Sequence, residues 1–286
     1  MNLHENDRVS QLKRWPGASQ PTISVVMPAM NEAMNLVHVF ERLDDDLYEV
    51  ILVDGNSKDD TVAVARRLRP DITIIGQTRK GKGNALACGF EAATGDIIVM
   101  IDADGSTDPA EIPLFVEALT SGADFAKGSR FLPGAGSSDI SRIRRLGNYI
   151  LNKVVNMVYG TRYTDLCYGY NAFRRECLPA MELDGGHKEG INETTMIWGD
   201  GFEVETLINL RIAKAGLKVT EVPSFEHSRR HGTSNLNAFS DGFRVLRTIH
   251  AERKRGARRA AVAARSLDQE WVTSPAALAL MAEQAR

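Results

Sequence analysis

The chain lacks the features that mark secreted and membrane-spanning proteins. It has only 3 cysteines among 286 residues, and Cys88, Cys167 and Cys177 show neither metal-site spacing nor the density of a disulfide scaffold. No segment reaches the roughly 18 apolar residues of a membrane-spanning helix. Residues 1–20 are polar and lack the apolar centre of a signal peptide. These absences predict a protein of the reducing cytoplasm that does not cross a membrane by itself.

The chain also lacks an excess of charge of either sign. Its formal net charge of −2 argues against a general nucleic-acid binder. The main local bias lies in residues 244–265, where basic residues crowd a predicted helix and Glu252 is the only acid. Two interpretations stay open for this segment: a solvated tail, or a peripheral electrostatic contact with an anionic membrane surface.

Apolar segments alternate with helical patterns over the first 130 residues. Strands are predicted at 23–27, 50–53, 72–76, 97–101 and 124–128, with helices at 34–47, 61–68, 84–93 and 109–120. This alternation predicts βαβ units and a mostly parallel sheet flanked by helices, an α/β fold.

The second half of the chain is less regular. Leu146, Ile150, Val154 and Met157 lie at helical spacing and predict an amphipathic helix. A strand is expected at 168–173, a helix at 202–215 and a strand at 218–222. The Gly-rich polar stretch 184–199 is expected to be a lid or an insert.

The strand at 97–101 runs directly into two carboxylates, Asp102 and Asp104. In open α/β sheets, ligands bind at the carboxyl ends of the strands. Mg²⁺ and Mn²⁺ take oxygen ligands and usually bridge to substrate phosphates. Asp-x-Asp at this point therefore indicates a metal–diphosphate site, although two acids after a strand can also simply begin a polar turn.

Three further polar segments stand at the same rim of the predicted sheet. Residues 28–32 (Pro-Ala-Met-Asn-Glu) follow the first strand, and 54–57 (Asp-Gly-Asn-Ser) follow the second. Residues 80–84 (Lys-Gly-Lys-Gly-Asn) precede a helix, where glycine N–H groups favour phosphate. Each could be a helix entry, a turn or a solvated bend, but together they indicate a nucleotide site.

In their order along the chain, these motifs resemble those of family-2 glycosyltransferases with the GT-A fold, and most of all the polyprenyl-phosphate branch that includes the dolichol-phosphate mannosyltransferases. The resemblance rests on Pro28-x-x-Asn31-Glu32, Val53-Asp54-x-x-Ser57, Gly81-x-Gly83-x-Ala85 and Asp102-Ala103-Asp104. It continues through Lys127–Phe131, Arg144–Asn148, Asp165-x-x-x-Gly169-Tyr170 and Arg229-x-x-Gly232-x-Ser234. It implies a GT-A domain over 21–250, with a nucleotide-binding half at 21–130 and an acceptor-side half at 131–250. The polar leader (1–20) and the basic tail (251–286) flank it.

The resemblance also implies roles for individual residues. Base and ribose would be held by Pro28, Glu32 and Asp54, and the full set expected to bind the nucleotide sugar is Pro28, Ala29, Asn31, Glu32, Asp54, Lys82, Gly83, Asp102, Ala103, Arg229 and Ser234. The expected metal ligands for Mg²⁺ or Mn²⁺ are Asp102, Asp104 and Ser106, with Asp104 also catalytic. The acceptor phosphate is expected on Arg130, Arg144 and Asn148, since Arg donates two hydrogen bonds to phosphate at once. Arg130 is also expected to be catalytic.

The acceptor decides whether a general base is needed. A polyprenyl phosphate is already anionic, whereas a hydroxyl acceptor requires a base within hydrogen-bond reach. Glu203 and Glu205 are the catalytic candidates for that role, although acids in a first helical turn also complement the helix dipole.

Several positions depart from the family pattern. Gly55 stands where many relatives have a second Asp, and Ser106 stands where mannosyltransferases have Gln. These changes weaken the expectation of mannosyl transfer to dolichol without weakening that of glycosyl transfer.

The resulting prediction is a metal-dependent, inverting glycosyltransferase that uses a UDP- or GDP-sugar and a polyprenyl phosphate, and that is cytoplasmic or peripheral at a membrane. One alternative is transfer to a soluble saccharide or metabolite hydroxyl. The others are a nucleotidyltransferase, which would carry a basic Gly-rich loop after the first strand, and a non-catalytic sugar-nucleotide binding protein.

Overall fold

The computed structural model describes residues 20–232 and 242–255. The polar leader, the basic tail beyond residue 255 and Ser234 lie outside these residues. Within them, no helix has the length and apolar character needed to cross a bilayer.

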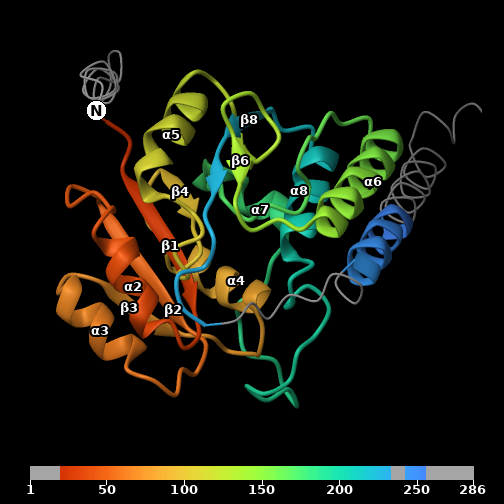
Figure 1. Cartoon of the computed structure of the whole chain (residues 1–286). Helices are drawn as coiled ribbons and strands as arrows, with labels where there is room; N and C mark the ends of the chain where they lie inside the picture. Colours follow the sequence, from red (N-terminus) through yellow and green to blue (C-terminus); the bar gives the residue numbers. More distant parts are fainter. Residues whose placement is uncertain (1–19, 233–241, 256–286) are drawn as a thin grey trace, which may run out of the picture.

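A twisted sheet of seven strands forms the centre of the molecule, in the order β3-β2-β1-β4-β7-β5-β8 (Figure 1). All strands run parallel except β7, which is antiparallel to both of its neighbours. The strands are β1 (Ile23–Ala29), β2 (Glu49–Asp54), β3 (Thr73–Gly76), β4 (Ile97–Met100), β5 (Phe125–Ser129), β7 (Asn171–Arg174) and β8 (Val219–Pro223). The expectation of a mostly parallel α/β sheet is confirmed.

Helices cover both faces of the sheet. One face carries α2 (Ala33–Phe40), α3 (Thr61–Leu68) and α5 (Ile112–Thr120), which follows the short η1 (Pro109–Glu111). The other carries α4 (Lys82–Ala92), α7 (Leu178–Met181), which follows η2 (Arg175–Cys177), and α8 (Val204–Lys214). The helix expected at 34–47 ends at Phe40, because the chain turns there and Arg69 binds the carbonyl groups of Asp44 and Asp45.

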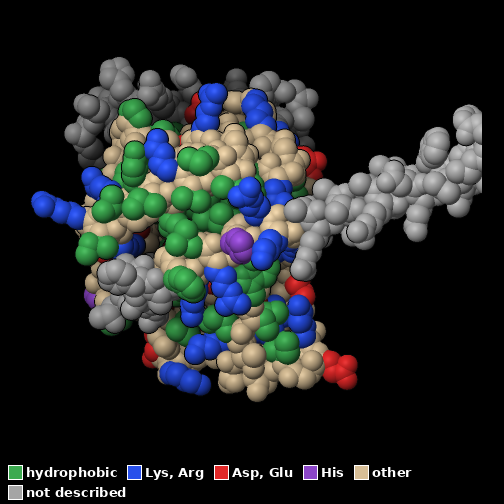
Figure 2. Space-filling view, turned by 90° about the vertical axis from the view of Figure 1, so that its right-hand side faces the viewer, with side chains coloured by type: hydrophobic (Ala, Val, Ile, Leu, Met, Phe, Trp, Pro, Cys, Tyr) green, Lys and Arg blue, Asp and Glu red, His purple; other side chains and the backbone are tan. Residues whose placement is uncertain are grey.

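The acceptor-side half adds elements outside the main sheet. β6 (Gly136–Ser137) pairs with β9 (Phe225–Glu226), and the long α6 (Arg142–Tyr159) packs beside a helix over 242–255. Figure 2 views the side of the molecule on which these two helices lie. The boundary expected at residue 250 falls inside the second helix.

The predicted amphipathic helix exists as α6, and Val154 packs against a small core, but the other three predicted apolar positions are exposed. Leu146, Ile150 and Met157 are exposed, whereas Asn148 and Asn152 are buried. The two amides are buried because they bind the 164–167 segment: Asn148 reaches Asp165 and Cys167, and Asn152 reaches Thr164 and Leu166.

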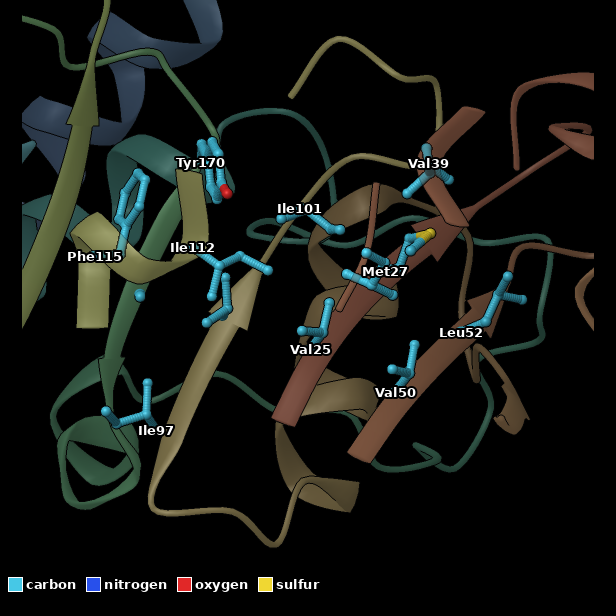
Figure 3. Close-up of a cluster of buried hydrophobic side chains, with 14 of the residues drawn as sticks. Val25, Met27, Val39, Val50, Leu52, Ile97, Ile101, Ile112, Phe115 and Tyr170 are labelled. Atoms are coloured by element: carbon cyan, nitrogen blue, oxygen red, sulfur yellow. The ribbon is translucent and has the colours of Figure 1, made fainter. Parts of the chain in front are cut away.

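The central parallel strands β1, β2 and β4 are largely buried on both faces, as their continuous apolar runs predict. Val25 and Met27 of β1 and Val50 and Leu52 of β2 pack under α2 and α5, and Figure 3 shows these side chains on one side of the sheet. Val26 and Ile51 point to the opposite face, beneath α4 and α8. The two cores fix the sheet, so the loops that follow β1, β2 and β4 meet at one rim.

Candidate active site

Lys82 joins two carboxylates from distant parts of the chain. Its Nζ lies 2.6 Å from Asp102 Oδ1 and 2.8 Å from Glu205 Oε1. Asp102 follows β4, Lys82 opens α4 and Glu205 lies in the first turn of α8. A side chain at position 169 would crowd this group, since a Cβ on Gly169 would lie 3.2 Å from Lys82 Nζ. The fold thus brings the expected Asp102, Lys82 and Glu205 into direct contact.

Arg229 makes a second bridge beside the first. Its guanidinium lies 2.5 Å from Glu32 Oε1 and 3.2 Å from Asp104 Oδ2. Its Nε donates to the carbonyl of His231, whose backbone also binds Asn35 of α2. The C-terminal loop is thereby held over the ends of β1 and β4.

The loop after β1 is shaped by the loop after β2. Asn31 adopts a left-handed φ of 61°, and its backbone N–H donates to Ser57 Oγ while its side-chain oxygen accepts from Lys58. Thr61 Oγ1 accepts the N–H of Glu32. The Ser57-x-Asp59-x-Thr61 motif therefore fixes the backbone of Asn31 and Glu32, two of the residues expected to bind the nucleotide sugar.

The other expected nucleotide residues of these loops lie at the same rim. The carbonyl of Ala29 accepts the N–H of Gly55, next to Pro28. Asp54 accepts the N–H of Ser57 at 3.3 Å. The side chain of Ala103 is buried in the core, so only its backbone can face a ligand.

The bridged cluster has an excess of negative charge. Four carboxylates, Glu32, Asp102, Asp104 and Glu205, face two cations, Lys82 and Arg229. Two negative charges are left, which is the charge that a divalent cation neutralises.

The donor set fits Mg²⁺ or Mn²⁺ bound together with a substrate. Among the described residues, no group of three or more His, Cys, Asp or Glu side chains could hold an ion alone. Asp102 and Asp104 can supply two carboxylates, and such ions usually complete their shell with water and substrate phosphates. Ser106 donates its N–H to Asp104 Oδ1 and accepts from the N–H of His227 through its carbonyl, so its backbone supports the Asp104 turn.

Burial and charge tune the ionisable groups of the cluster. Burial alone would lower the pKa of Lys82, but Asp102 and Glu205 outweigh it and raise the pKa above its ordinary value. Burial raises the pKa of Glu205, and Lys82 opposes this only in part. Burial also raises the pKa of Glu32 against hydrogen bonds from Asn35 and Arg229. Lys82 therefore stays charged at neutral pH and compensates the buried acid.

The glycine loop before α4 makes backbone hydrogen bonds to a distant segment of the chain. The N–H of Gly83 donates to the carbonyl of Asp200 at 2.7 Å, and that of Lys80 to Thr195 at 3.0 Å. Arg79, almost fully buried, binds Asp200 and the carbonyl groups of Asp184 and Gly186. The 184–200 segment thus covers the N-terminus of α4 and engages the N–H of Gly83, and the assignment of Gly83 to the nucleotide sugar stays a prediction.

Two of the expected acceptor residues are also engaged elsewhere. Arg130 donates to both oxygens of Asp165, at 2.7 and 2.9 Å, and to both oxygens of Glu226 at 3.0 Å, with only 4% of its side chain exposed. Asn148 is buried against Asp165. Both hold the acceptor-side half together in this structure, and their assignment to the acceptor phosphate stays a prediction. Arg144 is partly exposed beside Asp139 and is the accessible member of the three.

The two candidate bases differ in surroundings. Glu203 is buried, and its Oε1 accepts the N–H of Gly199 in the turn before α8. Its Oε1 is thus engaged in that turn, whereas Glu205 pairs with Lys82. Sequence reasoning missed the pairs of Lys82 with Glu205 and of Arg130 with Asp165, because partners 123 and 35 residues apart leave no local pattern.

Comparison with known proteins agrees with this geometry. Residues 24–180 match the profile of glycosyl transferase family 2. The chain is 31% identical over 243 residues to a dolichol-phosphate mannosyltransferase of Pyrococcus furiosus, covering 80% of this chain and 62% of that protein. It is 30% identical to an undecaprenyl-phosphate mannosyltransferase of Micrococcus luteus, covering 75% and 87%.

The fold also matches a solved structure. Glucosyl-3-phosphoglycerate synthase from Mycobacterium tuberculosis, in complex with Mn²⁺, UDP-glucose and phosphoglyceric acid, superposes with a TM-score of 0.64 at 23% identity, over 86% of this chain and 84% of that one. The shared architecture is the GT-A fold. With the profile spanning more than half of its residues, the chain belongs to glycosyl transferase family 2.

Proposed function

We propose that this protein transfers a sugar from a UDP- or GDP-sugar to a polyprenyl phosphate, with inversion at the anomeric carbon and with a divalent metal. The observation that carries the proposal is the cluster of four carboxylates and two cations at the carboxyl ends of β1 and β4. The names of the two mannosyltransferase relatives support a lipid phosphate acceptor.

Asp102 and Asp104 would hold the cation. When bound, it would neutralise charge developing on the departing nucleoside diphosphate. Glu32 and Asp54 would face the ribose and base, held in place by the Ser57–Thr61 loop. Metal use is also recorded for fold neighbours, which bind Mn²⁺ or Mg²⁺ with UDP.

Lys82 and Arg229 would turn toward the diphosphate. Each of these two side chains lies between carboxylates of the cluster. A metal ion on Asp102 and Asp104 would neutralise part of that negative charge in place of Lys82 and Arg229. Their N–H groups could then donate to phosphate oxygens, for which Arg offers two parallel hydrogen bonds.

A phosphate acceptor suits the surroundings of the two candidate general bases, Glu203 and Glu205. Glu205 is paired with Lys82, and Glu203 is bound within its turn. A phosphate oxygen is already anionic and needs neither group, whereas a hydroxyl acceptor would. Arg144, at the start of α6, is the accessible one of the three residues expected to bind that phosphate.

A partition assay tests the proposal. The full chain is incubated with Mn²⁺ and radiolabelled UDP- or GDP-sugar, with either polyprenyl phosphate in detergent or water-soluble acceptors, and extracted with organic solvent. Label in the organic phase that depends on polyprenyl phosphate is expected. Label that stays in water and grows with a soluble saccharide or phosphorylated acceptor would show the alternative acceptor class instead.

A further inference from the structure

The outer surface of α6 is apolar. Ile143, Leu146, Tyr149, Ile150 and Met157 project from it with 51–85% of their surface exposed. The adjoining helix over 242–255 adds two more exposed apolar side chains, Phe243 at 70% and Leu246 at 46%. We call these seven side chains the α6 face.

The inner surface of α6 is already packed against other parts of the chain. Leu151 and Val155 pack with Leu210, Val245 and Ile249 into a separate small core. The exposed apolar side chains are therefore not a core surface awaiting another part of the described chain. Contiguous exposed apolar surface of this kind marks an interaction site.

The exposed charged side chains of α6 and of the adjoining helix are all basic, and Asp139, just before α6, pairs with Arg144. α6 contains four basic residues, Arg142, Arg144, Arg145 and Lys153, and no acid. In the adjoining helix, the only acid, Glu252, is 1% exposed and turned inward onto Arg211 and Lys214. Figure 2 shows the result: hydrophobic side chains lie among Lys and Arg, and Asp and Glu appear only toward the margins of this view.

We propose that the α6 face docks onto an anionic phospholipid bilayer. Apolar side chains would enter the headgroup region while the surrounding Arg and Lys side chains meet anionic headgroups, as for helices that lie in the membrane interface. The proposal draws support from the proposed polyprenyl phosphate acceptor, since such a lipid resides in a bilayer. It extends the contact expected of the basic segment to α6.

Charge complementarity favours a lipid surface over a second copy of the chain. A two-fold symmetric dimer would bring the same basic residues of two copies together, and like charges facing each other across an interface oppose association. An anionic bilayer offers opposite charge and an apolar interior at the same place.

Co-sedimentation of the full chain with vesicles tests the proposal without donor or acceptor. Binding is expected to vesicles of phosphatidylcholine with phosphatidylglycerol, to be much weaker to phosphatidylcholine alone, and to fall as salt is raised. Because each basic residue near an anionic surface contributes about fivefold in binding, Lys153→Glu should weaken it by roughly 10- to 30-fold. Ile150→Asp and Met157→Asp should each weaken it on the order of tenfold.

Met34→Asp is the matched control, because Met34 is 64% exposed on α2, on the opposite side of the molecule (Figure 1). It should bind vesicles like the unchanged chain. Met157 is 85% exposed, so Met157→Asp should leave the fold intact. It tests the proposal even if circular dichroism shows that Ile150→Asp disturbs folding.

Three outcomes would overturn the proposal: equal binding by the α6 variants and the control, equal binding to both vesicle types, or a dimer in sedimentation velocity that Met157→Asp abolishes. The partition assay in detergent separates this result from the proposed function. Lipid transfer without vesicle binding would refute only the docking surface, and vesicle binding without transfer would refute only the proposed activity.

Discussion

Replacing Arg130 with Met should destabilise the protein strongly. Arg130 makes four hydrogen bonds to two carboxylates, and Arg130, Asp165 and Glu226 are 4%, 0% and 10% exposed. Removing the guanidinium leaves two buried carboxylates without their main counter-charge. Breaking a buried ion pair by removing one partner costs about 3–5 kcal/mol, so the free energy of unfolding should fall by about that amount.

Urea denaturation of the full chain at pH 7, followed by circular dichroism, measures this loss. Arg144→Met is the control: its ion pair with Asp139 is partly exposed, and such pairs contribute less than about 1 kcal/mol.

The contrary result is easily recognised. If Arg130→Met unfolds at the same urea concentration as the unchanged chain but loses glycosyl transfer, Arg130 acts on a substrate and its structural assignment is wrong. The comparison matters because the sequence motif alone suggests a phosphate ligand.

Three further predictions concern the site, pH dependence and α6. Asp104→Ala should reduce transfer by about 10²–10³-fold and abolish the Mn²⁺-dependent rise in melting temperature that a nucleoside diphosphate causes by mass action; an unchanged rise would refute the metal assignment. Burial alone would raise the pKa of Glu252, but Lys214 and other basic partners lower it, so Glu252→Gln should cost about 1–2 kcal/mol at pH 7. A group with a lowered pKa contributes its full stability above its unfolded pKa and loses it as the pH falls toward the folded pKa, so this difference should close as the pH falls below the ordinary value of 4.5. A gap that persists in denaturation at low pH would contradict it. Gly147→Ala should raise the melting temperature and stabilise α6 by about 0.5–1 kcal/mol, because nothing lies within 4 Å of the added Cβ; a lower melting temperature would be inconsistent with that space.

The sheet could be predicted because local pattern determines it. The run Ile97–Ile101 is apolar at every position, and a strand buried on both faces is what such a run forms. Asp102 and Asp104 follow this strand, so their place at the rim of the sheet could be predicted as well. Parallel strands place the loops that follow them at a common edge.

The structure adds contacts that local sequence pattern does not predict, because they join polar groups far apart in the chain. Asn148 and Asn152 look like the solvent side of a helix, yet both are buried on the 164–167 segment. Arg130 is expected to bind phosphate, and in the structure it is bonded to Asp165. The N–H of Gly83 donates to the carbonyl of Asp200, more than a hundred residues away. No local pattern in the sequence predicts this contact.

The antiparallel β7 has a consequence for the order in which the chain can fold. β1 to β4 can pair as soon as the first hundred residues exist, but β7 must insert between β4 and β5, and β5 then waits for β8 at Val219–Pro223. Pairings of such long sequence separation form slowly. The family segment 24–180 ends before β8, so during synthesis it would leave β5 with an unpaired, aggregation-prone edge. The seven-stranded sheet can be completed only after residue 223 has been synthesised.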